Sequence, residues 1–243
     1  MVVAPGIAAP LPVGAALFLP ARDEIDAIAG VIARVPRHAG GRPVTCVVID
    51  DGSTDGTADA ARTAGAQVVT IPGGAGLGAA VRRGLHEAET HAAAVVAFCD
   101  ADGEYAPEEL DRLVAPIFAG EADYVVGSRF SGHIDHMAPH RRLGNRVLTR
   151  VLRWIARTPI SDGQSGYRAL SADAARQVRI AHDYNYAQVL TLDAVRRGYR
   201  YTEVPISYSF REAGSSFVKL GAYLRHVVPS VLRVVNDAHR STG

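Results

Sequence analysis

Short apolar segments alternate with amphipathic segments over the first part of the chain, and this order constrains the fold more than any other feature. The apolar segments, which are expected strands, cover 15–19, 45–49, 67–71, 93–99 and 124–127. The intervening segments space their apolar residues as helices do, in 24–35, 57–64, 79–89 and 107–118. Such an alternation predicts an α/β fold, a mostly parallel sheet flanked by helices on both faces.

The alternation ends near residue 128, and the remaining pattern is more mixed. We expect a loop over 131–140, a helix over 143–156, a turn-rich stretch over 158–166 and a helix over 186–197. A strand or hairpin at 199–210 and a long amphipathic helix from 217 complete the expected elements. Because no repeat or low-complexity linker interrupts the chain, we expect 1–243 to form a single domain with two functional halves.

Composition excludes several classes of protein. The formal net charge of +1 over 243 residues gives no global field that would attract nucleic acid. Two cysteines do not make a disulfide framework, and both lie in expected strands. No apolar stretch approaches the roughly 20 residues that span a bilayer. A cytoplasmic location is therefore expected.

Acidic residues follow two of the expected strands. Asp50 and Asp51 come directly after 45–49, and Asp100, Asp102 and Glu104 come directly after 93–99. Because the carboxyl ends of parallel strands meet at one edge, these side chains are expected to lie near each other. Carboxylates with one spacer residue can jointly hold Mg²⁺ or Mn²⁺. The first loop also has a structural interpretation, because Asp, Ser and Thr are common in turns and helix caps.

Two other motifs admit competing interpretations. The glycine-rich stretch 73–78 is similar to a dinucleotide fingerprint, but no acid ends the next strand at the required distance. Its glycines are better explained by close approach to a neighbouring loop or by loop movement. His133, His136 and His140 could bind zinc, but their spacing fits no structural zinc motif. A flexible loop is favoured there.

The motifs, taken in order, resemble family 2 glycosyltransferases with the GT-A (Rossmann-like) fold. The matching residues are the loop 50–57, the triplet Asp100-Ala101-Asp102 and the run Gly127-Ser128-Arg129. Three later motifs are similar to the dolichyl-phosphate mannosyltransferase-like, or polyprenyl-phosphate glycosyltransferase, branch: the stretches 162–168, 203–206 and 211–216. The resemblance covers about 17–216.

The resemblance implies an inverting, divalent-metal-dependent hexosyltransferase that uses a nucleotide-diphosphate sugar. On this view about 15–128 bind the nucleotide sugar, about 129–216 form the acceptor half, and 217–243 form a C-terminal amphipathic helix. The acceptor half would supply an acceptor-side helical region to the GT-A fold. The donor would be linked to UDP or GDP.

The resemblance also carries over site residues one by one. The expected nucleotide-sugar-binding residues are Pro20, Ala21, Arg22, Glu24, Asp50, Asp51, Gly78, Asp100, Ala101 and Asp102. The expected ligands of Mg²⁺ or Mn²⁺ are Asp100, Asp102 and Glu104. The expected acceptor-binding residues are Arg141, Arg142, Asn145, Ser165, Arg168 and Ser216. The expected catalytic residues are Asp102, Arg129, Asp162 and Arg211, with Asp162 as the base if the acceptor is a hydroxyl.

The acceptor is expected to be a polyprenyl phosphate, with a soluble small molecule or natural product as the alternative. Leu77 and Phe217 stand where the family often has lysine, which weakens the lipid-phosphate interpretation more than the donor. A sugar-phosphate nucleotidyltransferase would need a glycine-rich loop with arginine after the first strand, where this chain has Pro20-Ala21-Arg22-Asp23. A non-catalytic nucleotide-sugar-binding module is the third class considered.

Two amphipathic segments raise the question of further partners. Six arginines stud the predicted helix around 141–157, which suits a solvated face, an anionic acceptor or a membrane-facing patch. The segment from Phe217 to Val235 combines an apolar stripe with Lys219, Arg225 and Arg233. Such a stripe can pack on the core, on a second copy in a homodimer, or in a peripheral membrane contact at the inner face of the membrane.

Overall fold

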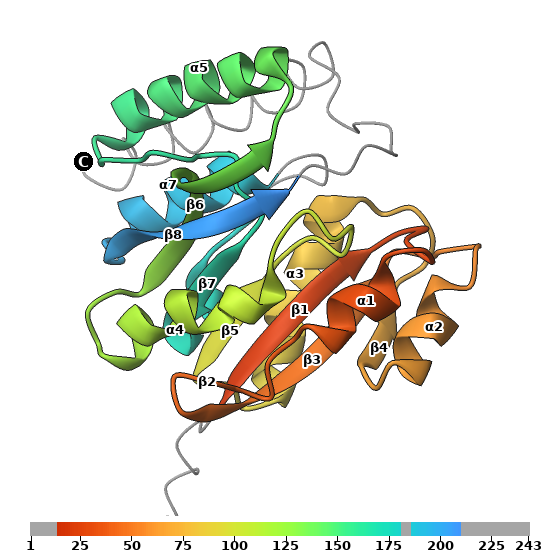
Figure 1. Ribbon diagram of the computed structural model, residues 1–243. Helices are drawn as coiled ribbons and strands as arrows, with labels where there is room; N and C mark the ends of the chain where they lie inside the picture. The colour runs from red at the N-terminus through yellow and green to blue at the C-terminus, as the bar shows by residue number, and fades with distance from the viewer. Residues whose placement is uncertain (1–13, 181–185, 210–243) are drawn as a thin grey trace, which may run out of the picture.

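The computed structural model describes residues 14–180 and 186–209 (Figure 1). Arg211, Ser216 and the amphipathic helix expected from residue 217 lie outside the described residues. The described part of the chain is built on one eight-stranded sheet. Its strands are β1 (Ala15–Ala21), β2 (His38–Ala39), β3 (Arg42–Asp50), β4 (Gln67–Thr70), β5 (Val95–Phe98), β6 (Tyr124–His136), β7 (Arg168–Ser171) and β8 (Tyr201–Ser209).

The sheet follows the order β2-β3-β1-β5-β7-β6-β8, with β4 paired to β3 beside β2. The pairs β1–β3, β1–β5, β3–β4 and β6–β8 are parallel, and β7 runs antiparallel to both of its neighbours. The predicted mostly parallel sheet is therefore confirmed. The hydrogen-bonded path through β5, β7 and β6 joins the strands before residue 128 to those after it.

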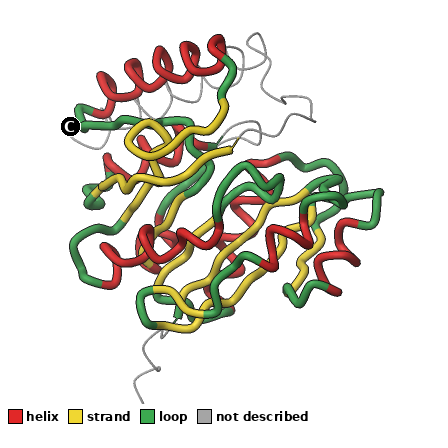
Figure 2. The backbone as a smooth tube through the Cα atoms, viewed as in Figure 1, coloured by secondary structure: helices red, strands yellow, loops and turns green. Residues whose placement is uncertain are grey.

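Helices cover both faces of the sheet, as Figure 2 shows. The helical elements are α1 (Ile28–Ala33), α2 (Thr57–Thr63), α3 (Leu77–Thr90), the 3-10 turn η1 (Pro107–Glu109), α4 (Leu110–Phe118), α5 (Pro139–Ala156), α6 (Ala172–Gln177) and α7 (Ala187–Arg196). Strand β1 illustrates how the layers form, because successive side chains point to opposite faces. Leu17 and Leu19 pack with α1 and α4, whereas Ala16 and Phe18 pack with α3 and α7.

The observed elements differ from the expected ones in three respects: a missed strand, a misassigned loop and a shorter helix. The strand β7 was not predicted, because its four residues carry no alternating pattern and are buried on both sides. The loop expected over 131–140 is instead the second half of β6 followed by the start of α5. Its residues are mostly polar, but backbone pairing with β8 holds them, with two register shifts. Helix α1 is shorter than the expected 24–35.

A close backbone contact explains how β6 continues through this polar stretch. A Cβ atom at Gly132 would lie 2.0 Å from the carbonyl oxygen of Ile206 on β8, so only glycine fits there. Further along, His133 and Asp135 interact with each other through their side chains. The histidines are thus spread over a strand and a helix, and the predicted flexible loop is not what the structure places there.

The candidate functional site

A cavity of about 580 Å³ opens at the carboxyl ends of β1 and β5, between the sheet and helix α5. This volume lies in the usual range for small-molecule sites. Of the predicted site residues, the cavity is lined by Pro20, Ala21, Arg22, Glu24, Asp51, Asp100, Ala101, Asp102, Glu104, Arg129, Arg141, Asn145 and Ser165. Residues from both predicted halves therefore meet at one site.

The loop after β3 is held by its own carboxylates. Asp51 accepts hydrogen bonds from the backbone N–H groups of Ala75 and Gly76, at 2.8 and 2.9 Å, and lies 3.7 Å from an Arg22 guanidinium nitrogen. Asp50 is buried and accepts a hydrogen bond from the backbone of Ser53 at 3.1 Å. Asp51 thus lines the cavity, whereas Asp50 shapes the turn and is not among the lining residues.

The glycine-rich stretch packs directly on this loop. Gly52 has φ +69°, and a Cβ atom there would lie 2.4 Å from the Cα atom of Gly73. Gly52 therefore permits this close backbone approach, whereas a Cβ atom at Gly73 would meet nothing within 4 Å. The expectation for the glycines of 73–78 themselves, close approach or loop movement, stays a prediction. Gly78 lies within α3, away from the cavity lining, while Gly76 and Leu77 just before it form part of the wall.

Three carboxylates line the cavity beyond β5. The backbone N–H of Glu104 donates to Asp102 at 3.0 Å, and Glu104 accepts a hydrogen bond from the hydroxyl of Tyr208. Burial, reinforced by the nearby charge of Glu104, raises the pKa of Asp100 to about 6. Burial and the charge of Asp100 raise the pKa of Asp102 to about 8. A cation bound between them would relieve this repulsion.

The carboxylate oxygens of these acids suit a hard divalent ion, but the acids are too few to complete its coordination shell. Within residues 14–180 and 186–209, no three His, Cys, Asp or Glu side chains converge tightly enough to hold a metal by themselves. Such an ion would need further oxygen ligands, and Mg²⁺ commonly takes them from water and substrate phosphates. Gly166 matters for the position of Asp100, because a Cβ atom there would lie 2.4 Å from its carboxylate. The residues present fit a metal shared with a phosphorylated ligand.

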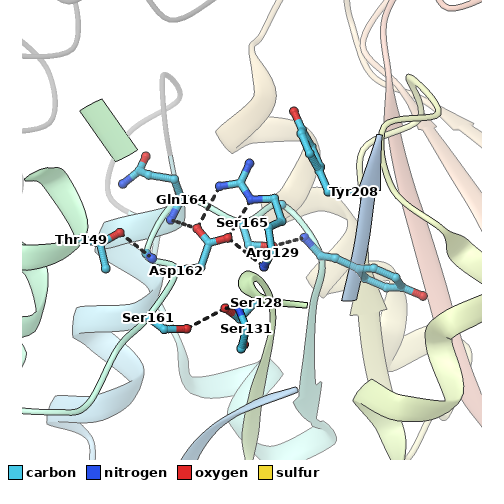
Figure 3. A network of polar contacts seen from close by, with 12 residues as sticks. Ser128, Arg129, Ser131, Thr149, Ser161, Asp162, Gln164, Ser165 and Tyr208 are labelled. Atoms are coloured by element: carbon cyan, nitrogen blue, oxygen red, sulfur yellow. Dashed lines mark hydrogen bonds and ion pairs between the residues drawn. The ribbon is translucent and has the colours of Figure 1, made fainter. Parts of the chain in front are cut away.

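Arg129 points into the cavity and is fixed from behind by Asp162 (Figure 3). Its Nε and Nη2 donate to the two carboxylate oxygens at 2.7 and 2.9 Å, and its backbone N–H donates at 3.1 Å. Its guanidinium lies 5.0 Å from the ring centroid of Tyr208, within cation–π distance. The arginine is therefore held in place, and its positive charge lies near the carboxylate of Asp100.

Asp162 does not have the surroundings expected of a general base. It is fully buried, and it also accepts a hydrogen bond from the backbone of Gln164 at 3.2 Å. Because both oxygens are engaged by Arg129, the carboxylate is not free to take a proton from an acceptor. Asp162 holds Arg129 in place in this structure, and its assignment as a base for a hydroxyl acceptor stays a prediction.

Arg168 is also held by other groups of the protein. Its side chain is fully buried on β7 and donates to the carbonyls of Ser165 and Ala187 at 2.8 and 2.7 Å. It also donates to the hydroxyl of Thr191 at 2.9 Å and to the hydroxyl of Tyr124. Arg168 thus joins the cavity wall at Ser165 to helix α7. Its predicted contact with an acceptor stays a prediction.

Helix α5 supplies one wall of the cavity. Arg141, Gly144, Asn145 and Leu148 line it from successive turns, whereas Arg142 is exposed and outside the lining. The inner face of α5 is anchored where the hydroxyl of Thr149 accepts a hydrogen bond from the backbone of Gly163 at 3.0 Å. Arg142 therefore stays a prediction without structural support at this site.

Sequence reasoning missed the aromatic and apolar part of the wall. It consists of Leu77, Ala80, Tyr105, Met137, Leu148, Tyr186, Ala187 and Tyr208. Tyr105 directly follows Glu104, the last of the three acids after β5, and could have been suspected from that position. The others come from distant segments that carry no polar signal, so only the fold brings them together.

Comparisons with known proteins show the family of this chain. The family model of glycosyl transferase family 2 matches residues 17–179. This chain belongs to glycosyl transferase family 2. Glycosyltransferase AglJ of Haloferax volcanii is 34% identical over 209 residues, which are 85% of this chain and 66% of that protein. Polyprenol monophosphomannose synthase of Mycolicibacterium smegmatis is 31% identical over 212 residues, 82% of this chain and 79% of that protein.

Solved structures confirm the GT-A fold of this glycosyltransferase. Glucosyl-3-phosphoglycerate synthase of Mycobacterium tuberculosis, in complex with UDP, matches with a TM-score of 0.71 and 25% identity. The match covers 91% of this chain and 80% of that chain. The resemblance to the polyprenyl-phosphate branch of the family is likewise confirmed. It is supported by AglJ and by polyprenol monophosphomannose synthase.

Proposed function

We propose that this family 2 enzyme transfers a hexose from a nucleoside-diphosphate sugar to a polyprenyl phosphate, with inversion at the anomeric carbon. One observation carries the proposal. The same cavity is lined by the acidic residues after β5, by the buried Arg129 of β6 and by Arg141 at the start of α5. Each part has a counterpart in the reaction: a diphosphate to bind, a negative charge to stabilise and an anionic acceptor to hold.

The donor would occupy the side of the cavity formed by the β1 and β3 loops. Asp51 and Arg22 are already fixed by the glycine-rich stretch and by each other, so these side chains would lose little conformational entropy when a nucleoside binds. The UDP-bound relative binds its nucleotide within the same fold. The transfer assay below uses both a uridine and a guanosine diphosphate sugar and so identifies the base.

The residues after β5 and Arg129 would stabilise the negative charge on the departing diphosphate. Asp100 and Asp102, with Glu104 as a further oxygen donor, would hold Mg²⁺ or Mn²⁺, which neutralises charge on the departing diphosphate. Arg129 adds a fixed positive charge, because Asp162 and Tyr208 hold its guanidinium in place. A group positioned before the reaction stabilises developing charge without reorganisation.

The acceptor would enter from helix α5. Arg141 and Asn145 offer hydrogen-bond donors to a phosphate, and Leu148 continues the same face with an apolar side chain. A phosphate monoester is already anionic near neutral pH, so it needs no general base. The engagement of Asp162 with Arg129 is compatible with such an acceptor and unfavourable for a hydroxyl.

A soluble phosphorylated acceptor is the second candidate. Glucosyl-3-phosphoglycerate synthase, by its name, acts on a small phosphorylated acid, and it shares the fold over most of this chain. The same Arg141 and Asn145 would then bind the phosphate of a small metabolite. The Leu148 side of the cavity would be left without an isoprenoid chain to contact.

A transfer assay tests the proposal and separates the two acceptors. Purified protein with Mn²⁺ would be given UDP-glucose or GDP-mannose together with undecaprenyl phosphate or 3-phosphoglycerate. We expect sugar transfer to the lipid phosphate, and Asp102→Asn should lower the rate by about a hundredfold or more. The control Asp59→Asn, an exposed residue on α2, should leave the rate unchanged.

Two results would count against the proposal. Near-normal turnover by the Asp102→Asn protein would remove the role of the acids after β5. Transfer to 3-phosphoglycerate with none to undecaprenyl phosphate would replace the lipid acceptor by a soluble one.

A further inference from the structure

Four hydrogen-bond donors converge on the carboxylate of Glu203 on β8. Its oxygens accept from the backbone N–H of Ser161 at 2.9 and 3.0 Å, from that of Asp162 at 3.2 Å, and from the Ser161 hydroxyl. The hydroxyl of Tyr201 donates to the same carboxylate at 2.5 Å. Glu203 begins the stretch 203–206, in which no site residue was expected, and it does not line the cavity. Any effect of Glu203 on the cavity therefore acts through another residue.

The segment that Glu203 binds has no regular secondary structure. Residues 157–167 connect α5 to β7 and lie in neither a helix nor a strand. Two side chains from other elements hold the middle of this loop: Glu203 binds residues 161 and 162, and the hydroxyl of Thr149 on α5 accepts from the N–H of Gly163 at 3.0 Å. Buried backbone N–H groups need such partners, and an ionised acceptor makes the stronger bond. Glu203 is thus a main anchor of the loop beside Asp162.

The anchored loop contacts Arg129 and its strand in two places. The carboxylate of Asp162 accepts from Nε and Nη2 of Arg129, at 2.7 and 2.9 Å. The hydroxyl of Ser161 lies 2.6 Å from that of Ser128, the residue just before Arg129 (Figure 3). Strand β6, which carries both of these residues, pairs in parallel with β8. The hydrogen bonds of Glu203 therefore continue, through two neighbouring loop residues, to a side chain that lines the cavity.

We propose that Glu203 positions Arg129: by binding the backbone beside Asp162, it holds the carboxylate that directs the guanidinium into the cavity. Arginine has several rotatable side-chain bonds, and a carboxylate fixed at both oxygens restricts them only if its own backbone is fixed. The inference deepens the proposed function, in which the charge of Arg129 stabilises the departing diphosphate, and rests on it for the effect on the rate. A displacement of about 1 Å can slow a reaction by about a hundredfold.

The alternative is a purely structural role, in which Glu203 joins β8 to the loop without affecting Arg129. The structure offers a matched comparison, because Glu109 makes the same kind of contact with the same strand. Its carboxylate accepts from the backbone N–H of Ser207 on β8 at 2.7 Å and from the Ser207 hydroxyl at 3.0 Å. Glu109 joins η1 to β8 and does not line the cavity. Glu109→Ala is therefore the control for the loss of a carboxylate contact with β8.

Hydrogen exchange at arginine Nε–H groups measures the proposed restraint directly. In protein grown with isotope-labelled arginine, the NMR resonance that Arg129→Lys removes reports on the Nε–H donated to Asp162. Arg168 is the internal reference for opening of the whole fold, because its buried Nε–H donates to the carbonyl of Ser165 at 2.8 Å. We expect Glu203→Ala to accelerate exchange at Arg129 by about tenfold or more and to leave exchange at Arg168 within about twofold.

Milder variants test whether the hydrogen bonds are the cause. Glu203→Gln keeps an amide oxygen that can accept from the backbone N–H groups of Ser161 and Asp162, so it should restore most of the protection at Arg129. Ser161→Ala removes one hydroxyl from the same contact and should raise exchange at Arg129 by a smaller factor than Glu203→Ala. This variant provides the measurement if Glu203→Ala does not fold. Glu109→Ala should leave exchange at Arg129 unchanged.

Three results would overturn the proposal. Unchanged exchange at Arg129 in the Glu203→Ala protein would mean that Asp162 holds the guanidinium without support from β8. Equal acceleration at Arg129 and Arg168 would mean that the variant loosens the fold as a whole. Acceleration at Arg129 that is as strong in Glu109→Ala would mean that any lost contact with β8 has the same effect.

The outcome is separable from that of the proposed function, because exchange is measured without turnover. In the transfer assay, Glu203→Ala should lower kcat by about tenfold or more and raise KM for the donor sugar by a smaller factor, since Arg129 acts on charge that develops during the reaction. Absence of transfer by the unaltered protein would remove the proposed function and leave the exchange result standing. Faster exchange at Arg129 with an unchanged kcat would remove Arg129 from charge stabilisation and leave its positioning by Glu203 intact.

Discussion

At the scale of single residues, several charged side chains near the cavity bind other groups of the protein, both side chains and backbone. Arg129 and Asp162 form an ion pair whose side chains are only 6% and 0% exposed. Asp50 shapes a turn, and Arg168 ties the cavity wall to α7. Buried charges require partners, so such residues are fixed by neighbours that satisfy them. The consequence is a rigid cation beside the acidic triplet.

The ion pair predicts a large stability effect for a small chemical change. Asp162→Asn removes the negative charge but keeps the volume, which leaves Arg129 buried without its ion-pair partner. We expect a loss of about 3–5 kcal/mol in the free energy of unfolding, measured by urea denaturation. The exposed pair of Asp59 and Arg62 provides the control, since Asp59→Asn should change the free energy by less than about 1 kcal/mol. Equal effects for the two variants would contradict the argument.

At the scale of elements, loops that meet at the sheet edge depend on glycine for their contact. The turn after β3 and the glycine-rich stretch approach so closely that a side chain at Gly52 would overlap the backbone of Gly73. Asp51 then binds the backbone of the same stretch. The side of the cavity that Asp51 lines is thus shaped by backbone packing between two loops.

A pair of glycine variants isolates this close approach from backbone strain. Gly52→Ala and Gly65→Ala both place alanine at a positive φ, of +69° and +93°, but only Gly52 has a neighbour in the way. Gly65→Ala should lose about 1 kcal/mol of stability, and Gly52→Ala clearly more. Titration with UDP and GDP should show weaker nucleotide binding for Gly52→Ala alone. Similar losses in both variants would mean that strain, and not the contact, decides.

At the scale of the whole molecule, the cavity is lined by segments from early and late parts of the sequence. Its walls come from β1, from the loops after β3 and β5, from β6 and from α5. No helix within the described residues is long and apolar enough to cross a bilayer. A ligand in this cavity would contact segments that are far apart in the sequence and stabilise the fold as a unit.

Thermal unfolding measures this coupling and the role of the metal. A nucleotide at a hundred times its dissociation constant should add about 2.7 kcal/mol of stability, which for a chain of this size raises Tm by roughly 5–10 °C. With Mn²⁺ and either UDP or GDP we expect such a rise, and EDTA or Asp102→Asn should remove most of it. A rise that persists in full after both treatments would show that the acids after β5 take no part in nucleotide binding.

The sequence by itself determined the alternating elements, the parallel part of the sheet and the position of the acids at one edge, because apolar periodicity and strand ends are local properties. Tertiary structure alone decided which polar residues face the cavity and which are buried as supports, as with Asp162 and Arg168. It also decided the antiparallel β7, the length of β6 and the apolar wall of the cavity. These depend on contacts between segments distant in the chain, and no local pattern records which partner a side chain will meet.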